Sequence, residues 1–430
     1  MLLPVLVIAA RSSAEPASKA PVAFPHFRVQ EIDKSLTVGY GVKLVDINGD
    51  GQPDIVVADS ARVIWFENPG AAAGPDAPWK LHLIIGDKQA GVKADNVCID
   101  AWDIDGDGKL DLVLGADWQP GNTNGGGSLQ WLSRGKTLDE PWTVHPILST
   151  LPTLHRAHFG DLDGSGRPKL IVGPLKGTGS TAAQNFTDAG SRLLVFDIPK
   201  DPVNDKWEPR VLTDELHVLH NFSPVPTMDP RTGNAVPGVQ ARQVLTASYE
   251  GVNLLAPASE GKATLTHLGA GNQDNPKASR GSSEIKIGHM KNGKTFLATV
   301  EPFHGNQVVI YTPPDEKADP GTLWTRTVLD DTLMAGHGVW CADLDGDGND
   351  EVVVGWREGP HTGIRLFKAT APNAKQWAAS DLDIGGVAVE DLAAADLNGD
   401  GRIDLVAVGR ATHNVRIYWN EGTAAGGVEK

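Results

Sequence analysis

Few features of disulfide scaffolds, membrane proteins or nucleic-acid-binding proteins occur in this sequence. Its 430 residues hold two cysteines, Cys98 and Cys341, which excludes a disulfide framework and predicts two buried free thiols. No segment is long and apolar enough to span a bilayer. No basic stripe is present, so nucleic acid is not an expected partner. Sustained helical periodicity is absent as well, which favours an all-β fold.

What the sequence does contain is an acidic loop that recurs along the chain. Four intact copies begin at Asp46, Asp103, Asp343 and Asp396, and each offers side-chain oxygens at loop positions 1, 3, 5 and 9. Oxygen ligands at these positions, with glycines that let the backbone turn, are what Ca²⁺ requires. A fifth copy, Asp161 to Lys169, has lost two of its ligands. The predicted calcium ligands are Asp46, Asn48, Asp50, Asp54, Asp103, Asp105, Asp107, Asp111, Asp343, Asp345, Asp347, Glu351, Asp396, Asn398, Asp400 and Asp404.

The spacing of these loops predicts the architecture. First aspartates of successive copies lie 57, 58 and 53 residues apart, and the unmarked stretch between positions 161 and 343 is 182 residues, room for two more repeats. Seven units of roughly 50–60 residues indicate a propeller. Each loop is followed by a β-branched run, a turn and further short strands, giving four strands per unit. We therefore predict an all-β, seven-bladed β-propeller of four-stranded blades.

Both ends of the repeat array support closure of a ring. The last repeat stops after its third strand, whereas the segment from residue 25 to 33 resembles an orphan fourth strand. We predict that this N-terminal strand completes the seventh blade. The expected single domain covers residues 23–424, with blades near 36–86, 93–150, 153–214, 215–270, 281–331, 335–383 and 387–421 plus 25–33.

A short apolar stretch at residues 2–10 precedes a small-residue segment that ends at Ala14. This pattern predicts that residues 1–22 are a signal peptide and leader, and that the protein is secreted or periplasmic. Export suits the acidic loops, because weak extracellular calcium modules with Kd of about 10⁻⁴–10⁻³ M are filled outside the cytosol. The formal net charge of −16 follows largely from the fourteen carboxylates at the ligand positions of the four intact loops, so it says little about partners.

Alignment of the repeats on the first loop aspartate singles out one position in the innermost strands. Residues two and four positions before it are apolar, as strand faces packed between blades should be. Six positions before it stand Tyr40, Val97, His155, His337 and Glu390. Packing does not explain titratable groups there, at the mouth of the central channel and at the end opposite the acidic loops. We therefore expect a functional site at this rim and structural cations at the other.

The two unmarked repeats add further histidines to this rim. By repeat length, the first strand of blade four falls near residues 216–222 and contains His217 and His220, and the rim loop of blade five carries His304. Imidazoles that converge on a channel suit a transition metal such as Zn²⁺, or general acid–base chemistry near neutral pH. Ser-His-Asp order, a phosphate-binding glycine loop and Cys₂His₂ spacing are all absent.

Two resemblances to known families rest on these residues. The Asp-x-(Asp/Asn)-Gly-Asp-Gly loops, each between strands, resemble the FG-GAP/VCBS repeats of α-integrin-like propellers. More narrowly, Leu151-Pro-Thr-Leu-His-Arg-Ala-His-Phe-Gly-Asp161, with the segments 170–175 and 336–340, resembles the propeller of aldos-2-ulose dehydratase/isomerase. Enzymes of that family dehydrate keto-sugars such as 1,5-anhydrofructose and glucosone. They carry cupin domains after the propeller, and none follows here, so the resemblance implies the dehydration step alone.

The resemblance implies an exported lyase that acts on a keto-sugar or keto-glycoside by proton abstraction beside the ketone and β-elimination. The predicted site consists of His155, His217 or His220, His304 and His337, supported by Arg156, Tyr40 and Glu390, with Trp118 or Trp356 stacking on a pyranose. The alternative is a non-enzymatic, calcium-stabilised FG-GAP propeller that binds glycan or protein through the same rim. A lyase for uronic-acid polysaccharides is disfavoured, because an acidic rim would repel its substrate.

Overall fold

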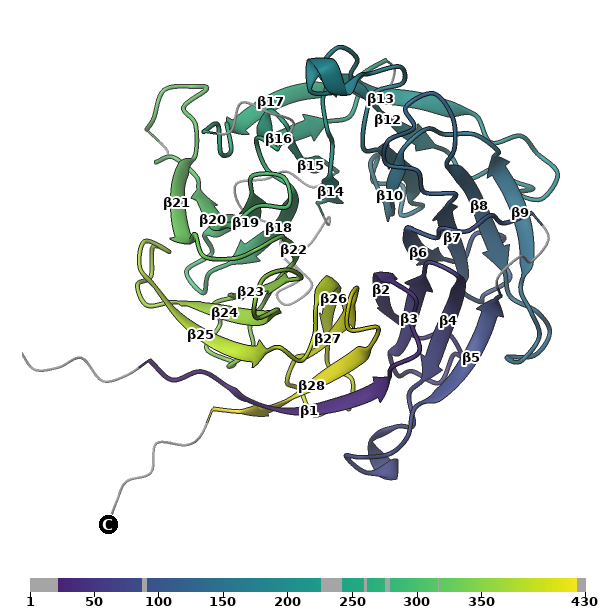
Figure 1. The fold of residues 1–430 in the computed structure, drawn as a ribbon, viewed down its shortest axis with the longest axis horizontal. Coiled ribbons are helices and arrows are strands. Elements are labelled where there is room, and N and C mark those ends of the chain that lie inside the picture. Colours follow the sequence, from purple (N-terminus) through teal and green to yellow (C-terminus); the bar gives the residue numbers. More distant parts are fainter. Residues whose placement is uncertain are drawn as a thin grey trace, which may run out of the picture.

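A computed structural model describes residues 22–86, 91–225, 242–258, 261–274, 279–315 and 317–423. Its strands form seven four-stranded antiparallel sheets arranged as blades around a central opening, which confirms the predicted propeller (Figure 1). Within these residues the helices are two 3-10 turns, η1 (Ala71–Ala73) and η2 (Ala182–Gln184). No helix in the described part of the chain has the length and apolar character needed to cross a bilayer.

Each blade uses four strands that follow one another from the channel outward. Blades one to three are β2 (Gly39–Val45), β3 (Asp54–Asp59), β4 (Arg62–Glu67), β5 (Lys80–Ile85); β6 (Cys98–Trp102), β7 (Asp111–Ala116), β8 (Ser128–Ser133), β9 (Thr143–Leu148); and β10 (Leu154–Gly160), β11 (Lys169–Pro174), β12 (Ser191–Phe196), β13 (Pro209–Leu216). Blades four and five are β14 (Asn221–Pro224), β15 (Val244–Ser248), β16 (Gly251–Ala256), β17 (Thr264–Gly269); and β18 (Glu284–His289), β19 (Thr295–Glu301), β20 (Gln307–Thr312), β21 (Thr325–Asp330). Blades six and seven are β22 (Gly336–Ala342), β23 (Glu351–Trp356), β24 (Gly363–Ala369), β25 (Trp377–Ile384); and β26 (Val389–Ala395), β27 (Asp404–Gly409), β28 (Val415–Gly422), with β1 (His26–Asp33) outermost.

The ring closes as the sequence predicts. Strand β1 pairs antiparallel with β28, from His26 opposite Gly422 to Asp33 opposite Val415, so the two ends of the described chain share one blade (Figure 1). Apolar side chains of blades one and seven meet beneath this closure, including Val57 and Val406. The second strands of the blades, such as β3 and β27, are buried along their whole length. Their β-branched sequences fit this position, because sheets pack on both of their faces.

Two details of blades three and four differ from the sequence prediction. The predicted boundary between residues 214 and 215 falls inside β13, which continues to Leu216. Strand β14 begins only at Asn221, so His217 and His220 precede it instead of lying within it. The deviation arises because blade four lacks the acidic loop that fixes the register elsewhere. Both cysteines are free, as expected, but only Cys98 is buried; Cys341 is partly exposed, which differs from the prediction of two buried thiols. The predicted leader, apart from residue 22, lies outside the described residues.

The acidic loops connect the first and second strands at the rim opposite the histidines. In the first loop, Asp46 accepts hydrogen bonds from the backbone N–H groups of Gly49 (2.7 Å) and Gly51 (2.8 Å). Both glycines have positive φ values, 81° and 88°, which other residues adopt at a cost. Asp54, at position 9, is fully buried and accepts the backbone N–H groups of Ile47 (2.9 Å) and Asn68 (2.8 Å). The loop is thus built around inward-pointing carboxylates.

Candidate active site

The innermost strand of four blades contains a β-bulge, and the bulges carry residues of the site. The pairing register skips one residue between Gly39 and Gly41, between Leu154 and Arg156, and between Val389 and Asp391, and it skips two residues between Gly336 and Val339. The skipped positions include Tyr40, His155, His337 and Glu390, the titratable residues that stand six positions before the loop aspartate. A bulge adds one residue to a strand and re-aims its side chain. Strict alternation along the strand would place these residues on the packed face, and the bulge breaks that alternation.

Three of the histidines also follow closely on a residue with a left-handed backbone conformation. Thr153, Val218 and Ala335 have φ values of 54°, 44° and 54°, and each stands two positions before a histidine of the site. These histidines are His155, His220 and His337. His304 itself has a φ of 46° in the loop between β19 and β20. Left-handed backbone is unfavourable for residues other than glycine, and such strain gathers where a structure must aim a functional side chain.

The strain predicts that Ala335→Gly stabilises the protein. Ala335 is partly exposed, so the loss of its methyl group removes little buried surface. A left-handed conformation costs an L-residue about 1–2 kcal/mol, partly offset by the extra freedom that glycine has in the unfolded chain. We expect the free energy of unfolding in urea to rise by about 1 kcal/mol. Ala335→Val, which adds β-branching at the same φ, serves as the matched control and should lower the free energy of unfolding. Equal effects of the two variants would contradict backbone strain at Ala335.

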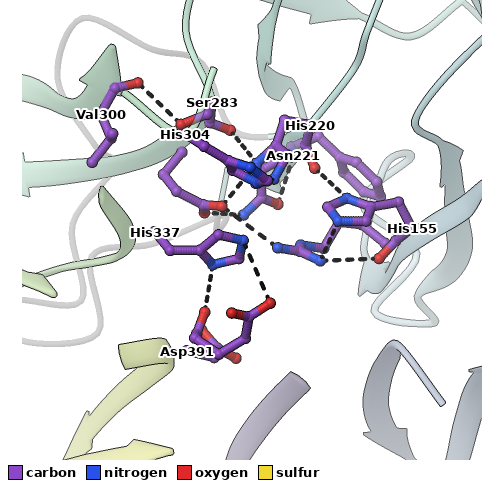
Figure 2. A network of polar contacts seen from close by, with 12 residues as sticks. His155, His220, Asn221, Ser283, Val300, His304, His337 and Asp391 are labelled. Carbon is purple, nitrogen blue, oxygen red and sulfur yellow. Dashed lines mark hydrogen bonds and ion pairs between the residues drawn. The ribbon is translucent and has the colours of Figure 1, made fainter. Parts of the chain in front are cut away.

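Four imidazoles converge at the channel mouth from blades three to six (Figure 2). The ring centroid of His220 lies 4.6 Å from that of His155, 4.7 Å from that of His304 and 5.1 Å from that of His337. The rings of His304 and His337 are 4.9 Å apart. Nitrogens of His220, His304 and His337 lie within 4.8 Å of one another, which is compatible with ligation of a single ion. The structure thus brings together one histidine from each of four blades.

Backbone carbonyls fix the tautomers of three of these rings. The Nδ1 atom of His155 lies 2.8 Å from the carbonyl oxygen of His220, and that of His220 lies 3.0 Å from the carbonyl oxygen of Ser283. His337 Nδ1 contacts the carbonyl oxygen of Glu390. Since a carbonyl only accepts, each Nδ1 carries the proton and each Nε2 presents a lone pair. Residues in or just before the innermost strand of the next blade therefore orient the histidine of the blade before it.

His304 completes the cluster through a different set of contacts. Its Nε2 lies 2.8 Å from Nε2 of His220, and its Nδ1 accepts a hydrogen bond from Nη2 of Arg357 at 3.2 Å. Because Nε2 of His220 is an acceptor, the proton of this pair resides on Nε2 of His304. A cation bound between the rings has to displace that proton, so its affinity should rise with pH.

Burial keeps all four imidazoles neutral. It lowers the pKa of His155, His220, His304 and His337 well below the usual range, and the neighbouring guanidinium groups of Arg156 and Arg357 lower these pKa values further. Neutral histidines at neutral pH are available as metal ligands and as proton acceptors. This state is the one that both versions of the predicted chemistry require.

Arginines and carboxylates surround the histidines as ion pairs. Arg156 contacts Nε2 of His155 through Nη1 at 3.1 Å, and its Nη2 lies 3.5 Å from Oε1 of Glu284. The same carboxylate oxygen lies 2.9 Å from Nδ1 of His220. Burial raises the pKa of Glu284, against the opposing charge of Arg156. Glu284 therefore links the third, fourth and fifth blades.

Glu390 lies in a second such pair, at the opposite side of the cluster. It accepts hydrogen bonds from Arg357 and, at 3.1 Å, from Arg410. Its Oε1 is 3.9 Å from Nε2 of His337. Two arginines hold this carboxylate, so it supports the site by positioning charge. The guanidinium of Arg410 lies 5.5 Å from the ring centroid of Tyr40. Burial, together with Asp95, raises the pKa of Tyr40, which keeps its hydroxyl protonated.

Not every predicted site residue joins the cluster. His217 turns away to pair with Glu250, its Nδ1 at 2.7 Å from Oε1, which decides the open choice between His217 and His220. Trp356 is buried, and its indole N–H donates to the carbonyl oxygen of His361 at 2.5 Å, so the predicted stacking of this ring on a sugar is wrong. Trp118 is partly exposed and packs 4.9 Å from the ring of His155.

Sequence reasoning missed two residues that contact the cluster directly, Glu284 and Arg357. Glu284 starts the first strand of blade five, where no acidic loop fixes the register. Arg357 follows the buried end of β23 and was recognised only as one of several polar rim residues. Arg357 could have been found from the sequence, because it occupies the loop in blade six that corresponds to the loop of Arg410 in blade seven.

Comparison with known proteins finds sequence similarity to two families. Residues 126–314, which include His155, His220 and His304, match the family model of the aldos-2-ulose dehydratase β-propeller domain, and residues 46–114 match the FG-GAP-like repeat. The chain resembles the aldos-2-ulose dehydratase propeller. The curated aldos-2-ulose dehydratase of Phanerodontia chrysosporium is 26% identical over 304 residues, which are 66% of this chain and 32% of that protein. The chain thus spans about a third of the length of this relative.

Solved structures show the fold alone. The structure of BBS1N in complex with ARL6DN is 12% identical and superposes with a TM-score of 0.52, covering 94% of this chain and 99% of that one. An ancestral GH74 enzyme is also 12% identical, with a TM-score of 0.51, and covers 91% of this chain and 45% of its own. Both are consistent with a propeller and carry no argument about chemistry.

Proposed function

We propose that this protein is a carbon–oxygen lyase that eliminates a leaving group from a keto-sugar or keto-glycoside. The observation that carries the proposal is the convergence of four neutral histidines with Arg156 at the channel mouth. The similarity to a dehydratase propeller supports it. A ketone acidifies the neighbouring C–H bond, and removal of that proton expels a hydroxyl or alkoxyl group from the next carbon. The required groups are a base, an anion stabiliser and an acid.

The residues divide these roles according to their contacts. His155 presents a lone pair on Nε2 and serves as the base that takes the proton beside the ketone. Arg156, which contacts that same nitrogen, stabilises the enolate oxygen that develops. Tyr40 lines the same cavity as Arg156, and its protonated hydroxyl delivers a proton to the leaving oxygen. The C–H and C–O bonds break, a C=C bond forms, and the leaving group departs as an alcohol or as water.

The remaining three histidines fit a transition metal such as Zn²⁺. His220, His304 and His337 offer neutral nitrogens within 4.8 Å of one another, and carbonyl oxygens orient two of the rings from behind. Such outer hydrogen bonds are typical of metal-ligating histidines. When bound, the metal would polarise the substrate carbonyl as a Lewis acid. Glu284 would hold His220 in place through Nδ1.

The proposal predicts release of p-nitrophenol from a p-nitrophenyl 3-ketoglucoside, in which the ketone activates the C2 proton and the leaving group is on C1. The product should show the ultraviolet absorbance of a conjugated enone. The matching glucoside without the ketone should be inert, because its C2 proton is not acidic. The assay is run on calcium-loaded protein with and without added Zn²⁺, and metal content is measured in parallel. No turnover in either condition, together with no deuterium exchange at C2, would refute the lyase and favour a glycan-binding propeller.

We propose in addition that the four intact acidic loops hold Ca²⁺ as structural ions. Burial raises the pKa of the position-9 carboxylates, to about 6 for Asp54 and Asp404, about 7 for Asp111 and about 8 for Glu351. A cation beside them would offset this burial. The fifth loop does not fit a metal, because Lys169 takes position 9 and its ammonium lies 3.0 Å from Asp163.

Blade six carries a competing ammonium that yields a testable difference in calcium affinity. Lys368 contacts Asp345 and lies 3.1 Å from Asp347, two of the proposed ligands. Lys368→Met should raise the affinity of this loop for Ca²⁺ at least about fivefold, because about 1 kcal/mol is the upper end for an exposed ion pair and this pair is largely buried. Calcium titration calorimetry measures the change. Lys169→Met is the control, since its loop lacks two ligands and should gain no site; an unchanged isotherm for Lys368→Met would contradict the competition.

A further inference from the structure

A cavity of about 200 Å³ lies in the channel, beside the histidine cluster but separate from it. Lys43, His158, Lys286, Trp340 and Asp391 line its walls, together with apolar residues of the innermost strands. None of the four clustered histidines lines it. Arg156 and Glu284 line the cavity and also contact His155 and His220, so they form the boundary between the two spaces.

Hydrogen-bond acceptors at the cavity are already engaged. Asp391 accepts the backbone N–H groups of Val42 (3.0 Å) and Leu392 (2.9 Å), one with each carboxylate oxygen. Asp100, which reaches the cavity wall through Lys43, accepts the ammonium of Lys43 at 3.1 Å and the backbone N–H of Phe159 at 2.9 Å. These two carboxylates thus tie the innermost strands of neighbouring blades together. They have little capacity left for a ligand.

Donors at the cavity are not engaged in the same way. Among the described residues, the Lys286 ammonium makes no hydrogen bond or ion pair; it lies 5.0 Å from the ring centroid of Trp340. Burial lowers the pKa of Lys286, and the charges of Glu284 and Asp391 raise it from a distance, without a hydrogen bond. Lys43 has the single partner Asp100. Lys286 is partly buried, and an ammonium that loses water contacts without gaining hydrogen-bond acceptors is destabilised.

The pairing of the charged groups points in the same direction. Three cationic groups, Lys43, Arg156 and Lys286, face three carboxyl groups, Asp100, Glu284 and Asp391. Lys43 contacts Asp100 and Arg156 contacts Glu284, whereas Asp391 accepts two backbone N–H groups, which leaves Lys286 without a contact to a carboxyl group. A ligand that completes the cavity therefore has to bring acceptor atoms to Lys286, and a carboxylate brings them together with a counter-charge.

We propose that the channel cavity is a binding site for a small carboxylate anion, with Lys286 as its principal donor and Trp340 as its apolar wall. The site adjoins the proposed lyase site and shares Arg156 and Tyr40 with it, but Lys286 and Trp340 take no part in the proposed elimination. An anion here would supply the counter-charge that the chain itself leaves out beside Lys286.

The experiment is a calorimetric titration of formate and acetate into the calcium-loaded full-length protein, in a zwitterionic low-salt buffer. We expect one equivalent to bind, and Lys286→Met to weaken binding at least tenfold. Lys286→Gln keeps a donor but no charge and should show the same loss, which guards against a folding defect in the methionine variant. Lys294→Met is the matched control, because Lys294 is an exposed lysine of the same β18–β19 hairpin.

Three outcomes would overturn the proposal. The first is no binding by the wild type, and the second is equal binding by the wild type and Lys286→Met. The third is chloride or phosphate binding at least as tightly as the carboxylates, which would assign the cavity to free inorganic anions. Formate binding and turnover of the 3-ketoglucoside are measured on the same protein, so the channel site and the proposed lyase site can fail separately.

Discussion

His220→Ala is expected to abolish the proposed elimination almost completely while His217→Ala leaves it intact. His220 contacts the three other histidines of the cluster and is fully buried, whereas His217, three residues earlier, pairs with Glu250 outside it. Loss of a positioned acid–base or metal-binding group lowers kcat by about 10²–10⁴-fold. We expect a fall of this size for His220→Ala, with loss of any bound transition metal, and a change of less than about threefold for His217→Ala.

Folding has to be separated from chemistry in this comparison. His220→Gln keeps a polar side chain in the buried position and should show the same loss of turnover with a smaller loss of stability. Thermal unfolding of each variant in Ca²⁺ identifies any that fail to fold. Equal losses of kcat in the His217 and His220 variants would mean that the geometry has selected the wrong histidine. Retention of metal by His220→Ala would remove this residue from the proposed ligand set.

Acidification to pH 5 should destabilise the protein by about 2 kcal/mol through His158 alone. Burial lowers the pKa of His158 to about 4, against the opposing effect of Asp100. Below its ordinary pKa of about 6.5 an unfolded histidine binds a proton that the folded one does not accept until about pH 4. The unfolded state therefore binds more protons in this window, and the free energy of unfolding falls by about 1.4 kcal/mol per pH unit as the pH falls.

Urea denaturation at pH 7 and at pH 5, in Ca²⁺, measures this effect. His158→Gln cannot titrate, so its stability should fall about 2 kcal/mol less over the same interval than that of the wild type. Other buried histidines add to the fall in both proteins and cancel in the comparison. His413→Gln is the control, because His413 is exposed. If His158→Gln and the wild type lose equal stability, His158 is not held neutral by burial.

The seven-bladed ring could be predicted because its determinants are local and repeated. Each acidic loop fixes a turn, the strand after it is β-branched, and the interval between loops gives the number of blades. The ring closure could be predicted as well, since β1 supplies the strand that the last repeat lacks. For the same reason His155 and His337 were recognised as equivalent, because both are registered on a loop aspartate in their own blade.

The site was less predictable where the register marker is missing. Blades four and five have no acidic loop, so repeat length could place His217 and His220 only to within a few residues, and Glu284 went unnoticed. Strict alternation along a strand would also misassign the direction of His155 and His337, because it cannot foresee a bulge. Trp356 illustrates the converse error: its position in a rim loop suggested an exposed ring, and the fold buries it.

By itself, then, the sequence determined the blades, the acidic loops and the presence of histidines at the rim, because strand and turn propensities act over a few residues. Only the tertiary structure decided which side chains meet. His155 is oriented by a carbonyl 65 residues away, His220 by one 63 residues away, and His220 and His304 are 84 residues apart. The unpaired Lys286 likewise emerges only when seven strands enclose one channel. Contacts between blades depend on how the ring packs, and no local pattern within one blade encodes them.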